Sequence, residues 1–169
     1  VASGSKPEEV TRAMTTELAI DGKAPEFLLP DQVGKQVSLK SLKGRQVVLY
    51  FYPKDDTPGC TKEACDFRDS MASITTTGAV VLGISLDGAT SHQKFIDKYQ
   101  LPFALLSDEG TTVSKSYGVY KQKTMYGKKR WGIERSTFVI DEAGRLKAMF
   151  RKVKVDGHVN EVLAALKAK

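Results

Sequence analysis

Cys60 and Cys65 are the side chains with the clearest capacity for chemistry, and they are the two cysteines of a 169-residue chain. One close pair in a chain of this length is no secreted disulfide framework, and a redox-active dithiol fits it better. Zinc binding is the competing use of paired cysteines, but the histidines, His92 and His158, lie far from the pair in sequence. We therefore expect a reaction at sulfur without a metal or an organic cofactor.

The segment before Cys60 predicts how its sulfur is activated. Residues 47–52 form an unbroken apolar run, which indicates a buried strand, and Pro53 ends it because proline cannot donate to a sheet. Thr57 suits the N-cap of a helix and Pro58 its first position, so Cys60 falls at the third helical position. Backbone N–H groups there have no partner within the helix and favour an anion. The thiol of Cys60 should therefore ionise more readily than that of a free cysteine.

The helix that carries both cysteines separates them onto different faces. One apolar face is formed by Cys60, Ala64, Phe67, Met71 and Ile74. Cys65 lies about 140° around the helix from Cys60, and their Cα atoms would be about 8.7 Å apart in an intact helix. A disulfide needs a Cα separation below about 7 Å. If the two cysteines bond, the helix must first unwind locally.

At these residues the chain resembles the peroxiredoxins. Pro53, Thr57 and Cys60 fit the pattern Pro-x-x-x-Thr-x-x-Cys of that family. The surrounding YPKDDTPGCTKEACDFRD resembles the peroxiredoxin Q, or bacterioferritin comigratory protein, subgroup, in which a second cysteine follows the first by five residues. The resemblance extends over nearly the whole chain after Ala24. It implies an α/β protein of thioredoxin-like fold, with a mixed central β-sheet flanked by helices and an N-terminal β-hairpin.

The same resemblance implies a thioredoxin-dependent thiol peroxidase acting on hydrogen peroxide and organic hydroperoxides. Cys60 would be the peroxidatic cysteine, which becomes a sulfenic acid, and Cys65 the resolving cysteine, which closes an intrachain disulfide. Thr57 would accept a hydrogen bond from the backbone near Cys60 and direct its hydroxyl toward the sulfur or the peroxide. Pro53 would shield the pocket from water, and the amides of Gly59 and Cys60 would help to bind the peroxide.

A positive charge near the sulfur is the remaining requirement, and the resemblance places it at Arg135. A guanidinium there would stabilise the Cys60 thiolate and orient the peroxide oxygens. Spacing alone does not distinguish Arg135 from Arg130 or Arg151.

The rest of the chain predicts a single domain over residues 21–169, long enough to bury its own core. Residues 1–20 form an N-terminal extension to which no role is assigned. The patterns predict, in order, a hairpin turn at 31–34, a strand at 80–85, a helix ending at Tyr99, a strand at 103–106, a short helix at 111–117, a hairpin over 137–152 and a final helix from Gly157. Residues 119–132 are expected to form a loop. This order predicts a mixed sheet with helices on both faces.

Charge and hydropathy bear on partners and location. The net charge is +6, and basic residues are densest at residues 121–131, which also contain aromatic side chains. Such a cluster can bind nucleic acid, but it is more often a solvated loop, or it attracts an acidic protein such as a reductase. We expect no nucleic acid, no membrane and a monomer. No apolar run reaches membrane-spanning length and no signal peptide is visible, which favours the cytoplasm, or an organelle after removal of a transit peptide.

Two other classes of function remain as alternatives at this point. A thioredoxin-like disulfide oxidoreductase without peroxidase activity is the first, although such proteins usually carry Cys-x-x-Cys, which is absent here. A chaperone or nucleic-acid-binding module that uses the basic surface is the second. Only a binding module should keep its function when both cysteines are replaced.

Overall fold

The computed structural model describes residues 18–169, with the backbone alone described at Met125. The extension predicted over residues 1–20 therefore falls almost wholly outside the described residues, and its boundary stays a prediction. Within residues 18–169, no helix combines the length and the apolar character that crossing a membrane would require.

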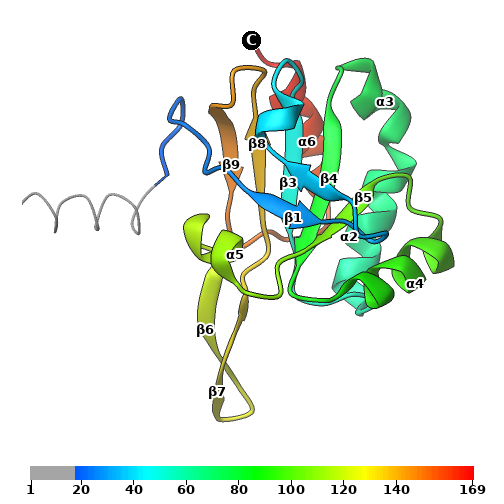
Figure 1. The fold of residues 1–169 in the computed structure, drawn as a ribbon, viewed down its shortest axis with the longest axis vertical. Coiled ribbons are helices and arrows are strands. Elements are labelled where there is room, and N and C mark those ends of the chain that lie inside the picture. Colours follow the sequence, from blue (N-terminus) through cyan, green and yellow to red (C-terminus); the bar gives the residue numbers. More distant parts are fainter. Residues whose placement is uncertain (1–17) are drawn as a thin grey trace, which may run out of the picture.

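A five-stranded mixed β-sheet forms the centre of the molecule, in the order β5-β4-β3-β8-β9 (Figure 1). Strands β3 (Val47–Phe51), β4 (Val80–Ser85) and β5 (Ala104–Ser107) are parallel, and β8 (Ser136–Ile140) runs antiparallel to both β3 and β9 (Leu146–Phe150). All residues of β3 are buried, which explains the unbroken apolar run of the sequence. The prediction of a mixed central sheet is confirmed.

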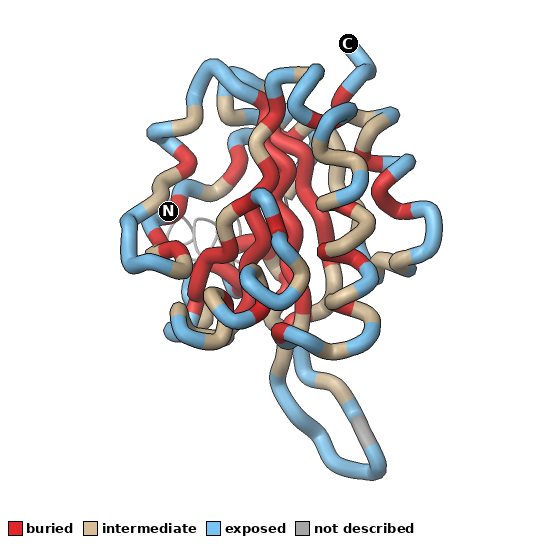
Figure 2. Tube along the Cα trace, turned by 90° about the vertical axis from the view of Figure 1, so that its right-hand side faces the viewer, coloured by how far each residue is buried: buried red, intermediate tan, exposed pale blue. Residues whose placement is uncertain are grey.

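The two faces of the sheet are covered by different elements. Along β3, Val48 and Tyr50 belong to one core, and Val47, Leu49 and Phe51 to the other, because successive side chains point to opposite faces. The first core is closed by α2 (Pro58–Asp69), α3 (Met71–Thr76), α4 (Ala89–Tyr99) and α6 (His158–Lys167). The second is closed by α5 (Thr112–Ser116) and by the predicted N-terminal hairpin of β1 (Leu28–Pro30) and β2 (Gln36–Ser38), which the short helix η1 (Lys40–Leu42) follows. Figure 2 shows the buried strands between these layers.

The loop predicted for residues 119–132 is wrong. These residues form an antiparallel hairpin of β6 (Tyr120–Met125) and β7 (Lys128–Ile133), which projects from the body of the molecule (Figures 1 and 2). Its turn is made by Tyr126 and Gly127, both at positive φ, a conformation typical of two-residue hairpins. Most of its described side chains are exposed, so the sequence lacks the alternation of apolar and polar residues that would have predicted strands.

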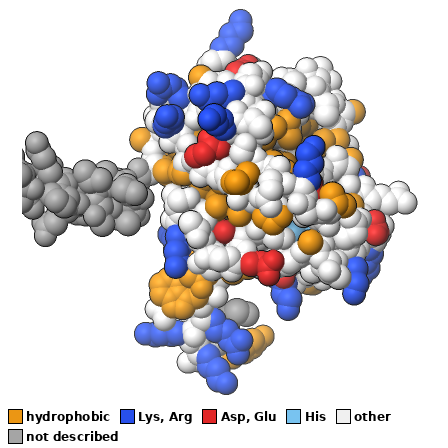
Figure 3. All heavy atoms as spheres, viewed as in Figure 1, with side chains coloured by type: hydrophobic (Ala, Val, Ile, Leu, Met, Phe, Trp, Pro, Cys, Tyr) orange, Lys and Arg blue, Asp and Glu red, His pale blue; other side chains and the backbone are white. Residues whose placement is uncertain are grey.

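The hairpin also carries a dense cluster of positive charge. Lysine and arginine side chains gather on it, beside exposed hydrophobic side chains (Figure 3). Its exposed cations are Lys121, Lys128, Lys129 and Arg130. Trp131 is 59% exposed and stacks on Tyr120 with a centroid distance of 5.4 Å.

Candidate active site around Cys60

The start of α2 follows the sequence prediction closely. Thr57 is the N-cap residue in extended conformation, Pro58 opens the helix, and Cys60 is the third helical residue with 1% of its surface exposed. The first hydrogen bond of the helix runs from the Thr61 N–H to the Thr57 carbonyl, at 2.8 Å. The N–H groups of Gly59 and Cys60 precede it, as free helix-terminal amides do, and they make the end of α2 favourable for an anion.

The hydroxyl of Thr57 differs from its predicted arrangement. It donates to the Lys54 carbonyl at 2.9 Å and makes no capping bond with the helix amides. The physical reason is the tight loop before the helix, where Asp56 adopts a left-handed φ of 57° and the Thr57 hydroxyl meets the Lys54 carbonyl. The prediction that Thr57 accepts from the backbone near Cys60 is therefore wrong for this conformation. Pro53 follows β3 as predicted and is half-buried.

Arg135 is the cation that reaches the sulfur. Its Nη2 donates to Cys60 Sγ at 3.4 Å, although the two residues lie 75 positions apart. Sheet pairing explains the encounter, because Ser136 at the start of β8 is paired with Phe51 at the end of β3. Among the alternatives, Arg151 donates to the Tyr117 carbonyl instead, at 3.2 Å. The guanidinium thus places a positive charge directly beside a buried sulfur.

Gly59 provides the space in which the guanidinium lies. A Cβ atom at this position would be 3.1 Å from Arg135 Nη2. This is closer than ordinary van der Waals contact, so a side chain at this position would force the guanidinium to shift. Gly59 therefore contributes to the site by the absence of a side chain, besides the backbone amide assigned to it from the sequence.

Glu63 is a member of this cluster that the sequence analysis missed. Its Oε1 accepts from Arg135 Nη1 at 2.7 Å, and its side chain is fully buried. Burial raises the pKa of Glu63 to about 7, although the neighbouring guanidinium favours the charged form. Its position three residues after Cys60 puts it on the apolar face of α2. A single carboxylate among apolar residues was the signal in the sequence that could have identified it as a site residue. Among the described residues, Glu63 Oε2 has no hydrogen-bond partner.

Cys65 lies on another face of the same helix and is partly exposed. Both cysteines are free thiols, and α2 is continuous from Pro58 to Asp69. The helix ends at Ser70, so the predicted single apolar stripe is divided between α2 and α3. Because α2 is intact in this conformation, a bond between the cysteines would require the helix to unwind first.

Comparison with known proteins identifies the family of the chain. Residues 20–149 match the model of the AhpC/TSA family. The chain is 56% identical over 149 residues to a putative peroxiredoxin bcp of Coxiella burnetii, covering 88% of this chain and 99% of the relative. It is 51% identical over 154 residues to peroxiredoxin Bcp of Bacillus subtilis, covering 91% of this chain and 97% of the relative.

Solved structures give the same result for the fold. PrxQ of Xylella fastidiosa superimposes with a TM-score of 0.84 at 36% identity, over 90% of this chain and 97% of that one. The bacterioferritin comigratory protein of Xanthomonas campestris gives a TM-score of 0.80 at 43% identity, over 83% and 90%. The fold is therefore thioredoxin-like, and the chain belongs to the AhpC/TSA family, within the peroxiredoxins named Bcp or peroxiredoxin Q.

Proposed function

We propose that this peroxiredoxin reduces hydrogen peroxide and organic hydroperoxides with Cys60 and regenerates itself through Cys65. The observation that carries the proposal is the contact of 3.4 Å between Arg135 Nη2 and Cys60 Sγ at the amino end of a helix. A cation and free amides around one buried thiol favour a thiolate, the nucleophilic form of cysteine. The homologous Xanthomonas campestris protein is described by its alkyl peroxide reduction activity.

The first step is an attack of the Cys60 thiolate on the terminal oxygen of the hydroperoxide. A sulfur–oxygen bond forms while the oxygen–oxygen bond breaks, and the departing oxygen takes up a proton to give water or an alcohol. Cys60 is oxidised to a sulfenic acid. The guanidinium of Arg135 and the amides of Gly59 and Cys60 hold the oxygens in line with the sulfur, and Thr57 and Pro53 border the site.

The second step joins the two cysteines. The Cys65 thiolate attacks the Cys60 sulfur, a disulfide forms, and hydroxide leaves as water after protonation. This step requires α2 to open between the cysteines, since the intact helix keeps them apart. An external dithiol, for which we propose thioredoxin, then reduces the disulfide. The monomeric state and the cytoplasmic location remain predictions of the sequence.

A disulfide oxidoreductase without peroxidase activity is less favoured by the geometry. Such an enzyme exchanges disulfides with other proteins, and its nucleophilic sulfur must be reachable by a large substrate. Cys60 is 1% exposed, which suits its reaction with a small peroxide better than its reaction with a protein.

The test is peroxide consumption coupled to thioredoxin, thioredoxin reductase and NADPH, with hydrogen peroxide and an organic hydroperoxide. NADPH oxidation should depend on both the peroxide and the protein, and Cys60→Ser should abolish it. A wild-type protein that reduces no peroxide, with thioredoxin or with a small dithiol, would overturn the proposal.

A further inference from the structure

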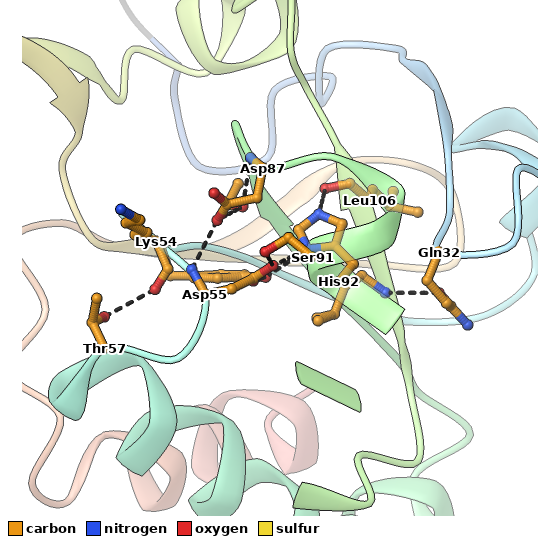
Figure 4. A network of polar contacts seen from close by, with 11 residues as sticks. Gln32, Lys54, Asp55, Thr57, Asp87, Ser91, His92 and Leu106 are labelled. Atoms are coloured by element: carbon orange, nitrogen blue, oxygen red, sulfur yellow. Dashed lines mark hydrogen bonds and ion pairs between the residues drawn. The ribbon is translucent and has the colours of Figure 1, made fainter. Parts of the chain in front are cut away.

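A second polar cluster lies behind the loop that leads into α2, and its centre is His92 of α4. The imidazole is fully buried. Its Nδ1 lies 2.7 Å from Asp55 Oδ2, and its Nε2 lies 3.0 Å from the Leu106 carbonyl oxygen (Figure 4). Both ring nitrogens therefore face oxygen atoms.

The hydrogen bonds of this cluster engage both ring nitrogens of His92 and both side-chain oxygens of Asp55. The Leu106 carbonyl can only accept, so His92 Nε2 donates to it, and Nδ1 shares a hydrogen bond with Asp55 Oδ2. Asp55 also accepts from the hydroxyls of Tyr52 and Ser91, so its oxygens meet three partners in all. Loss of either partner of the His92–Asp55 contact would leave a buried polar group unpaired.

This pair fastens the loop before Cys60 to α4. Asp55 belongs to the segment of residues 53–57, and its N–H donates to Asp87 Oδ2 at 2.8 Å. The next residue, Asp56, accepts from Lys98 at 2.8 Å and from Tyr99 at 3.0 Å, both on α4. Two consecutive carboxylates thus bind one helix, Asp55 in the interior and Asp56 at the surface.

Burial of the His92–Asp55 pair carries a desolvation cost. A buried ion pair often adds nothing to stability over an apolar replacement. What such a pair provides is a fixed geometry, since each donor must meet its acceptor. In this protein the pair fixes the segment of residues 53–57, which contains Pro53 and Thr57 and leads into the N-terminus of α2.

We propose that His92 is a positioning residue for Cys60, which acts through Asp55 to keep residues 53–57 clamped on α4. This inference rests on the proposed peroxidase function. The clamp holds the first turn of α2 so that Cys60 stays in contact with Arg135. This is the arrangement in which Cys60 attacks peroxide. A weaker clamp slows this attack and favours the opened α2, from which Cys65 closes the disulfide.

The test compares His92→Gln, Asp55→Asn and the double variant with the wild type. The second-order rate of Cys60 oxidation by hydrogen peroxide should fall about tenfold in each single variant, equivalent to roughly 1.4 kcal/mol in the barrier. The double variant should be no slower than the slower single variant, because both changes break one contact. At high peroxide, the fraction of Cys60 converted to sulfinic acid should fall, because an opened helix favours the disulfide.

Ser114→Ala is the matched control, because the buried Ser114 hydroxyl donates to the Asp108 carboxylate at 2.6 Å, a contact that includes no residue of the loop. It should lower the melting temperature and leave the oxidation rate and the sulfinic acid fraction unchanged. A wild type that fails to react with peroxide overturns the peroxidase proposal. An active wild type with unchanged variants overturns only the role of His92.

A spectroscopic measurement keeps the inference testable if the variants fold poorly. In the reduced wild-type protein, the ring ¹⁵N shifts of His92 should show both nitrogens in hydrogen bonds. The shift of a ring nitrogen without a hydrogen bond would overturn the clamp as described.

Discussion

At the scale of single residues, the site depends on how one guanidinium is shared. Arg135 donates to Cys60 through Nη2 and to Glu63 through Nη1. Because burial raises the pKa of Glu63 to about 7, this carboxyl group is largely neutral below that pH and leaves the positive charge to the sulfur. Above that pH, the Glu63 carboxylate competes with the Cys60 sulfur for the positive charge of Arg135.

Glu63 should therefore make the stability of the protein depend on pH. Its pKa in the folded state, about 7, lies above the ordinary value of 4.5, so the folded protein binds the proton more tightly. The contribution of Glu63 to the free energy of unfolding should be highest below pH 4.5 and be lost as pH rises through about 7, by up to roughly 3 kcal/mol. Urea unfolding of the reduced protein at pH 5 and pH 8 measures the loss, and Glu63→Gln should remove most of it. An equal loss in the variant would show that other groups cause it.

Gly59 offers a way to disturb Arg135 without weakening the helix. In Gly59→Ala the new methyl group would approach Nη2 to 3.1 Å, which should displace the guanidinium and slow peroxide attack several-fold. The melting temperature should hold or rise, because alanine suits a helix better than glycine. Gly132→Ala, where a Cβ meets nothing within 4 Å, is the control and should react at the wild-type rate. Stopped-flow oxidation would decide, and an unaffected Gly59→Ala would remove the packing argument.

At the scale of elements, the proposed disulfide requires α2 to adopt a second conformation. The reduced helix runs through both cysteines, and the disulfide cannot form on it. Near its end the helix is tied to α4, because Arg68 donates to the Tyr99 carbonyl at 2.7 Å. Opening is therefore expected in the turns before Arg68.

Oxidation should unwind this part of the helix. Amide exchange over residues 61–67 should become faster in the oxidised protein, whereas α6 should keep its protection and serve as the internal control. Hydrogen exchange with mass spectrometry on both redox states makes the comparison. Equal protection of residues 61–67 in the two states would contradict an intrahelical disulfide.

The individual elements also show how much of the structure the sequence could predict. The core strands β3 and β4 were predictable because burial on both faces demands apolar residues, and the start of α2 because cap and proline positions are local signals. The β6–β7 hairpin was missed because its strands are held by backbone pairing with little burial. Arg135 was predicted only through the family resemblance, since its contact with Cys60 depends on long-range pairing of β3 and β8. Glu63 was missed because a buried carboxylate contradicts the usual preference of charged residues for the surface.

At the scale of the whole molecule, the basic β6–β7 hairpin suggests how the protein attracts its reductant. Residues 120–133 contain five lysine or arginine residues and no acidic residue: Lys121, Lys123, Lys128, Lys129 and Arg130. Such a surface would attract an acidic dithiol protein and would have no effect on a neutral peroxide.

Salt should therefore separate the two half-reactions. The kcat/KM for an acidic thioredoxin should fall as ionic strength rises, and the rate of peroxide attack should not. Replacing Lys128 and Lys129 by alanine should reduce that salt dependence, whereas replacing Lys167 and Lys169 at the other end of the chain should not. If both lysine pairs behave alike, the hairpin has no special part in the encounter.

The central claim, that Cys60 attacks peroxide and Cys65 resolves the product, is tested most directly by one turnover followed by intact mass spectrometry. With one equivalent of peroxide, the wild type should lose two hydrogen atoms as its disulfide forms. Cys65→Ser should gain one oxygen atom as the Cys60 sulfenic acid and then stall with thioredoxin as the only reductant. Cys60→Ser should leave the peroxide unconsumed and its own mass unchanged. Peroxide consumption by Cys60→Ser, or full thioredoxin-dependent turnover by Cys65→Ser, would contradict the account.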